Sequence, residues 1–216
     1  MWQELQDSLA DQNFTVIAVA EESRGAEQAR PWVEKAGALS YPCLVDTDHR
    51  LAALYGMVNV PQAVWIDEAG RIARPPESAG ATDHFRHMDQ VTKTMAPDDQ
   101  AARMATRAAY IQAVRDWVRS GAHALDAASA RRRLPVITAE TALADAHFRL
   151  GVWLRHHGNA AEAAEHLAEA SRLHPDSWNM WRQAADLEAV GNAGGPAFWA
   201  RVQALGDRSY YPPAIL

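Results

Sequence analysis

The first part of the chain alternates between short apolar runs and amphipathic stretches. Apolar residues recur at positions i, i+3 and i+7 over residues 2–12, which predicts an amphipathic helix. A continuous apolar, β-branched run at residues 14–20 is typical of a strand covered on both faces, and a second helix is predicted at about residues 26–36. The pattern therefore begins with helix, strand and helix.

The next apolar runs predict three more strands. Residues 41–45 form the first, and Pro42 favours a position at a sheet edge or at a strand start. A short helix that ends at Gly56 leads to a buried strand at residues 58–67, and a tight turn joins it to a return strand at residues 71–74. Strand, helix, strand, helix and hairpin follow in the order of an α/β sandwich with a mixed sheet.

The composition changes after the predicted hairpin. Residues 75–80 are rich in proline, glycine and serine, which predicts a turn-rich exit. Beyond them the chain is alanine-rich, and one long helix is predicted at about residues 98–122. We therefore predict an α/β domain over residues 1–76, a linker with a connecting helix over 77–137, and a helical tail over 138–216.

Four short segments carry a family resemblance through their order and spacing. They are Glu21-Glu22-Ser23, Tyr41-Pro42-Cys43-Leu44-Val45-Asp46 with Leu54-Tyr55-Gly56, Val58-Asn59-Val60-Pro61, and Trp65-Ile66-Asp67-Glu68-Ala69-Gly70-Arg71-Ile72. With these segments, residues 2–72 resemble the bacterial-type ResA/TlpA group of thioredoxin-like (redoxin) proteins and, more loosely, the peroxiredoxins. The resemblance implies a thioredoxin-like sandwich.

The resemblance also implies a peptide-binding edge. In the family, the proline that matches Pro61 follows a cis peptide bond, and the backbone of the residue that matches Val60 pairs with an extended substrate. Glu22 matches the acidic residue near the family's dithiol. The implied peptide-binding residues are therefore Val60, Pro61 and Glu22. The bond between Val60 and Pro61 is expected to be cis, which costs an X-Pro sequence only about 0.5 to 1 kcal/mol.

The chain contains a single cysteine, Cys43. One thiol cannot form an internal disulfide or a Cys-x-x-Cys pair, and in relatives that pair immediately precedes the helix that here begins at Trp2. Cys43 lies in the predicted strand 41–45 and not at a helix N-terminus, where the dipole would stabilise a thiolate. We predict a truncated thioredoxin-like sandwich with no catalytic residue and no cofactor.

The absent strand would lie in the middle of the family's sheet, between the strands that match residues 14–20 and 63–67. Unpaired backbone groups in a buried layer cost about 1 to 3 kcal/mol each. Three alternatives follow. Residues 14–20 pair directly with 63–67, a second chain fills the gap and makes a homodimer, or the natural protein is longer than this sequence.

Residues 144–175 resemble a tetratricopeptide (TPR) repeat, which has a period of about 34 residues. The matching positions are Leu150, Gly151, Gly158, Ala163, Leu167, Ala170 and Pro175. One hairpin and an additional helix are fewer than the ~3 repeats that a free-standing solenoid needs. We therefore expect this TPR-like hairpin to pack on the α/β part or on a second subunit. The aromatic and proline-rich residues 210–213 are expected to dock as an extended arm.

Composition and charge exclude several classes of function. The formal net charge of −6 argues against a nucleic-acid partner. The chain has neither the apolar length of a membrane span nor the pattern of a signal peptide, so we expect a cytoplasmic protein with no membrane partner. The spacing of His84 and His87, with Asp83 beside them, is compatible with metal ligation but does not by itself indicate it. We predict that these are surface histidines and that there is no metal site.

Two functional hypotheses of different classes follow. The first is a redox-inactive thioredoxin-like module that binds or scaffolds a protein or peptide partner. The second is a ResA/TlpA-like thiol-disulfide oxidoreductase whose Cys-x-x-Cys lies upstream of a truncated or mis-annotated start. A one-cysteine peroxiredoxin-like peroxidase that uses Cys43 is the least favoured alternative. We favour the first, because the chain has no pair of thiols.

Overall fold

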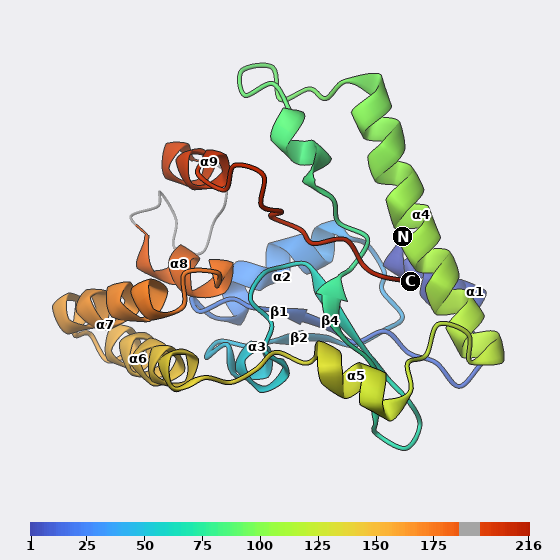
Figure 1. The fold of residues 1–216 in the computed structure, drawn as a ribbon, viewed down its shortest axis with the longest axis horizontal. Coiled ribbons are helices and arrows are strands. Elements are labelled where there is room, and N and C mark those ends of the chain that lie inside the picture. The colour runs from blue at the N-terminus through green and yellow to red at the C-terminus, as the bar shows by residue number, and fades with distance from the viewer. Residues whose placement is uncertain (186–194) are drawn as a thin grey trace. The chain divides into compact units, whose positions relative to one another are not determined.

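The structure is a computed structural model in which residues 1–185 and 195–216 are described. It is a mixed α/β fold with small sheets and many helices (Figure 1). The chain forms two compact units, and each is assembled from separate stretches of sequence. Unit 1 consists of Met1–Phe14, Pro61–Leu134 and Ala200–Leu216, and unit 2 consists of Thr15–Val60 and Pro135–Trp199.

In the part of the chain that the structure describes, every strand lies at or before Ser78, and helices occupy most of the remainder. In chain order the elements are α1 (Trp2–Ser8), β1 (Ala18–Ala20), α2 (Ala26–Lys35), β2 (Cys43–Val45), α3 (Arg50–Tyr55), β3 (Gln62–Ile66), β4 (Ile72–Ser78), the 3₁₀ helix η1 (Asp83–His87), α4 (Pro97–Ser120), α5 (Ala127–Arg133), α6 (Ala139–His156), α7 (Ala160–Leu173), α8 (Trp178–Ala184) and α9 (Pro196–Gln203).

The described strands form two separate pairs. In unit 2, β1 runs parallel to β2 with Ala18 opposite Cys43. In unit 1, β3 and β4 form an antiparallel hairpin with Gln62 opposite Ser78, which confirms the predicted hairpin. Gly70 has a φ of 74° in the turn between them, a conformation that a residue without a Cβ adopts at little cost.

The alternative in which residues 14–20 pair directly with 63–67 is wrong. Among the described strands, β1 pairs with β2 and β3 pairs with β4, so the two segments belong to different sheets. The first strand is also shorter than predicted, because only Ala18–Ala20 has strand geometry. The homodimer alternative stays a prediction.

Strand β4 continues through the segment whose composition predicts a turn-rich exit. It extends from Ile72 to Ser78 and includes Pro75 and Pro76. Proline lacks the N–H that a regular ladder requires, and it is tolerated where a strand is at an edge or where pairing is irregular. The pairing of β3 with β4 does shift register near Trp65. The turn prediction is therefore wrong for residues 75–78, which belong to β4, and correct only for Ala79 and Gly80, where the chain bends.

The core of unit 1 is aromatic. Trp65 of β3 donates a hydrogen bond from Nε1 to the hydroxyl of Tyr110 on α4, at 2.9 Å, and its ring lies 5.1 Å from that of Trp117. Leu5 and Leu9 are fully buried, which confirms the predicted apolar face of the first helix. Burial raises the pKa of Tyr110 far above its ordinary value, so this hydroxyl stays neutral and serves as a hydrogen-bond acceptor for Trp65.

Helices α6 and α7 form a hairpin that provides the core of unit 2 (Figure 1). Its buried cluster contains Ala144, Phe148, Val152, Leu167, Ala170 and Met180 of α8. The N-terminus of α6 has a capping box, in which Thr138 and Thr141 each satisfy the backbone N–H of the other. The hairpin lies where the sequence pattern places it, and its likeness to a TPR stays a prediction.

The hairpin packs on the α/β residues of its own unit, as expected. The ring of His49 lies edge-on to Phe148 at 5.3 Å, and Ser23 donates a hydrogen bond to Gln183 at 2.7 Å. His156 lies 2.7 Å from the carbonyl oxygen of Ser23. These contacts are largely buried, so the hairpin does not stand alone in the structure.

The aromatic C-terminal arm is docked within unit 1, which confirms that expectation. The backbone N–H groups of Tyr210 and Tyr211 donate to the carboxylate of Asp83 at 2.8 and 2.6 Å. Tyr210 is buried, and its ring lies 5.0 Å from that of Phe85. Among the described residues, no helix has both the length and the apolar character needed to cross a membrane.

Candidate functional site

The three residues implied in peptide binding lie in loops. Glu22 follows β1, and Val60 ends the first stretch of unit 2, where its side chain is 40% exposed. Pro61 begins the adjoining stretch of unit 1, directly before β3. Glu22 and Val60 therefore belong to unit 2, and Pro61 belongs to unit 1. A joint role of the three residues in peptide binding stays a proposal.

Helix α8 holds the loop that leads to Val60. The backbone N–H groups of Trp178 and Asn179 donate to the carbonyl of Val58 at 2.7 and 3.1 Å. The side-chain amide of Asn179 donates to the carbonyl of Met57 at 3.2 Å. The first N–H groups of a helix have no acceptor within the helix, so the loop carbonyls satisfy donors that the helix leaves unpaired. Residues 57–58 are thereby fixed from the helical side of the unit.

The side chain of Asn59 accepts the hydrogen bond of the Val60 backbone N–H. Its Oδ1 accepts the Val60 N–H at 2.9 Å and the Arg182 Nη2–H at 3.0 Å. Asn59 and Arg182 are both buried. The family resemblance implies that this backbone is available to an extended substrate, whereas here its N–H is already satisfied by a neighbouring side chain.

Glu22 forms an ion pair with Arg24. Nε and Nη2 of Arg24 donate to the two carboxylate oxygens at 2.7 and 2.6 Å, and the Arg24 backbone N–H donates to the same group at 3.0 Å. These hydrogen bonds hold the pKa of Glu22 below its ordinary value, so the carboxylate is charged at neutral pH. The carboxylate of Glu22 is therefore paired with Arg24, a neighbour on the loop after β1.

A hollow of about 310 Å³ lies beside this loop in unit 2. Its lining is mostly apolar and comes from β1, α2, β2 and the loops that join them; it includes Glu21, Glu22, Trp32, Val33, Tyr41 and Cys43. Trp32 is 71% exposed at its rim. An apolar hollow with a large exposed aromatic ring can accept an apolar side chain of a partner.

Cys43 is half-buried in β2. Its Sγ lies 4.0 Å from the carbonyl oxygen of Tyr41. Within the described residues, no cationic side chain makes a hydrogen bond or ion pair with it, and it does not lie in the first turn of a helix. The surroundings thus lack the features that activate a thiolate.

We expect that this chain will not catalyse the reduction of insulin disulfides by dithiothreitol, because it has one thiol in a strand and no second thiol to resolve a mixed disulfide. The measurement is insulin turbidity against the uncatalysed rate, with thioredoxin as the positive control. Thioredoxin-like activity that disappears in Cys43→Ser would contradict this expectation.

The structure also contains a buried pair that the sequence pattern does not indicate. His49 Nδ1 lies 3.3 Å from Oε2 of Glu21, and both side chains are less than one-tenth exposed. His49 has a φ of 51°, and its Nε2 is buried with no hydrogen-bond partner among the described residues. The two residues are 28 positions apart and share no motif, so only folding brings them together.

Comparison with known proteins finds one family model that matches part of the chain. Residues 1–74 match the model of the AhpC/TSA family. The match covers about a third of the sequence and supports a thioredoxin-like character for this part. No curated protein and no solved structure matches the chain.

Proposed function

We propose that this chain is a redox-inactive, thioredoxin-like module that binds an extended segment of a partner protein at Val60. The observation that carries the proposal is that hydrogen bonds from α8 order Met57 and Val58, close in sequence to Val60, whose side chain is exposed. A backbone that is already ordered loses little conformational entropy when it pairs with a peptide. Such a loop suits β-strand addition, in which main-chain hydrogen bonds supply affinity.

Asn59 acts in this proposal as a removable cap. Its Oδ1 accepts from both Val60 and Arg182 in the free protein. A peptide carbonyl can bind the Val60 N–H only when the hydrogen bond between that N–H and the Asn59 oxygen breaks. Arg182 then keeps that oxygen paired, so the exchange leaves no buried acceptor without a donor.

The family assignments support a protein partner. We assign residues 1–76 to the ResA/TlpA type of redoxin, with Pro61 at its cis-proline position, and the match to the AhpC/TSA family is compatible with this assignment. We assign the α6–α7 hairpin to the TPR type, in which stacked helices present a binding surface. The hollow beside Trp32 is an additional place for an apolar side chain of the partner.

We expect the chain to bind an extended polypeptide, and the affinity to change in opposite directions in two Asn59 variants. The probe is fluorescein-labelled, reduced and carboxymethylated α-lactalbumin, which is extended and has no free thiol. Asn59→Ala removes the side-chain acceptor from the Val60 N–H and should tighten binding about 3- to 10-fold, whereas Asn59→Asp is a stronger acceptor and should weaken it by a similar factor. Fluorescence anisotropy measures both.

Native α-lactalbumin is the control ligand, and Leu54→Ala is the control variant, because Leu54 is an exposed residue on α3 of the same unit. General destabilisation would move both Asn59 variants in the same direction, which would contradict the cap. A wild-type chain that does not bind the extended probe, or that binds native α-lactalbumin equally well, would contradict the binding function itself.

A further inference from the structure

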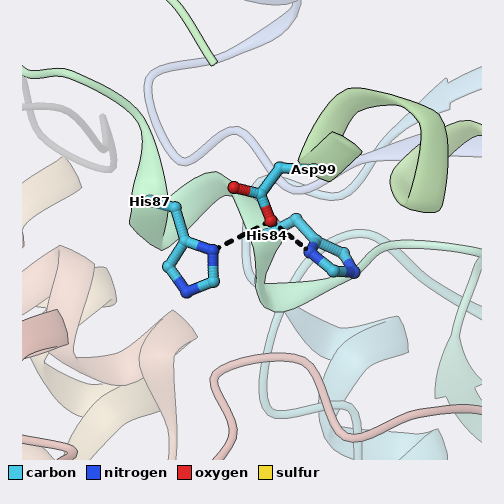
Figure 2. A group of neighbouring side chains, drawn as sticks. All are labelled: His84, His87 and Asp99. Atoms are coloured by element: carbon cyan, nitrogen blue, oxygen red, sulfur yellow. Dashed lines mark hydrogen bonds and ion pairs between the residues drawn. The ribbon is translucent and has the colours of Figure 1, made fainter. Parts of the chain in front are cut away.

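Two histidines of η1 converge on one carboxylate of α4. Figure 2 shows the rings of His84 and His87 directed at the carboxylate of Asp99, with a dashed line from each ring. The Nδ1 atoms lie 2.8 and 2.9 Å from the same oxygen, Oδ1 of Asp99. A 3₁₀ helix has three residues per turn, so positions i and i+3 are eclipsed and the two imidazoles share a face. The three potential ligand atoms all lie within 4.8 Å of one another.

The other residues of η1 anchor it to the C-terminal arm. Asp83 accepts the two N–H groups of Tyr210 and Tyr211, so it faces the arm and not the histidines. Arg86 donates to the carbonyl of Gly206 at 2.8 Å. The grouping of Asp83 with the two histidines is therefore corrected to a grouping with Asp99. A helix held along one row of residues presents the neighbouring row, here His84 and His87, with little freedom, which is the preorganisation that a ligand site needs.

Asp99 is positioned by the start of a long helix. It lies in the first turn of α4, a helix of 24 residues that begins at Pro97. Its side chain is 21% exposed, that of His84 is 34% exposed and that of His87 is 64% exposed. The carboxylate is thus mostly buried, and the imidazoles, above all that of His87, are accessible to solvent.

The donor set matches the chemistry of zinc. Zn²⁺ prefers imidazole nitrogen and carboxylate oxygen, and tetrahedral coordination at about 2.0 Å places neighbouring ligands about 3.3 Å apart. The N···O separations of 2.8 and 2.9 Å would widen by about half an ångström, which side-chain rotation can supply. Three protein ligands with access to solvent leave a fourth position for water.

The sequence pattern predicts no metal site at these histidines, but it does not show Asp99 beside them. We propose that Nδ1 of His84, Nδ1 of His87 and the carboxylate of Asp99 bind a Zn²⁺ ion in unit 1, with one coordination position open to solvent. The ion would replace the two hydrogen bonds to Asp99 by direct bonds to the metal. It would also link η1 to the first turn of α4 across residues 88–96. This site lies outside residues 1–74, the part that matches a known family.

We expect one Zn²⁺ to bind the chelator-treated full chain, as measured by calorimetric titration with zinc chloride in a buffer without phosphate. His87→Ala and Asp99→Asn should each weaken binding at least about 10-fold, since the first removes a ligand and the second replaces a charged carboxylate by a neutral amide, which is a poor zinc ligand. His87 is the most exposed of the three, so its replacement is the least intrusive, and far-UV circular dichroism verifies the fold. Co²⁺ in place of Zn²⁺ should give visible absorption bands that are lost in the same variants.

The matched control is the double variant His147→Ala/His166→Ala. These two residues of the α6–α7 hairpin also face each other, with their Nδ1 atoms 2.8 Å apart, and they are the rival place for a zinc ion. The double variant should retain the wild-type affinity. Absence of stoichiometric binding at micromolar zinc, or binding that survives His87→Ala and is lost in the His147/His166 variant, would overturn the proposal.

Discussion

Leu167→Ala is expected to lower the free energy of unfolding of unit 2 by about 3 to 5 kcal/mol. Leu167 lies on α7 with no exposed surface, in the cluster with Phe148 and Val152. Truncation removes three carbon atoms and leaves a cavity between two helices whose facing residues cannot close it fully. Urea denaturation followed by circular dichroism measures the change. Leu143→Ala on α6 is the matched control, because Leu143 is about half exposed and should cost far less.

Gly151 provides a second, independent readout of the same contact. A Cβ at this position would lie 2.7 Å from Cγ of Leu167 and 3.2 Å from the carbonyl oxygen of Ala163. Gly151→Ala alone should therefore destabilise the hairpin, although alanine favours helix by about 1 kcal/mol. In the double variant the new methyl group occupies part of the space that Leu167 vacates. Additive effects of the two changes would contradict this packing.

Arg74→Ala is expected to cost about 3 to 5 kcal/mol of unfolding free energy in unit 1. Arg74 of β4 is only 1% exposed. Its Nε and Nη2 donate to the carboxylate of Glu77, both at 2.8 Å, and its guanidinium lies 5.2 Å from the centre of the Trp65 ring. Removal of the guanidinium leaves Glu77 charged and mostly buried with no cation opposite it. Arg74→Lys should recover little, since an ammonium cannot make the two parallel hydrogen bonds.

The same substitution should release the C-terminal arm. Nη1 of Arg74 donates to the carbonyl of His123 and Nη2 donates to the carbonyl of Ile215. Hydrogen exchange at residues 210–216 should therefore be faster in Arg74→Ala. The control is Arg71→Ala, because Arg71 pairs with Asp67 in an exposed ion pair that contributes little. An Arg74 variant no less stable than the Arg71 variant would show that the buried pair is dispensable.

The sequence by itself determined the local elements of this protein. The helical spacing of Leu5 and Leu9 predicted a buried face, and both residues are fully buried. The tight turn between the apolar runs at residues 58–67 and 71–74 predicted a hairpin, and the resemblance of residues 144–175 to a TPR repeat predicted a pair of packed helices. These predictions succeed because periodicity and turn chemistry depend on neighbours within a few positions of the chain.

Only the tertiary structure decided which distant groups meet. Asp83 is next to His84 in sequence, yet its carboxylate accepts hydrogen bonds from the C-terminal arm. The carboxylate that lies beside both histidines is that of Asp99. The Val60 N–H is satisfied because α8, more than 110 residues later, orders the loop before it. A single sequence shows which side chains can donate or accept, but not which of several competent partners is close enough. That choice depends on the packing of whole elements, and it determines both candidate sites in this chain.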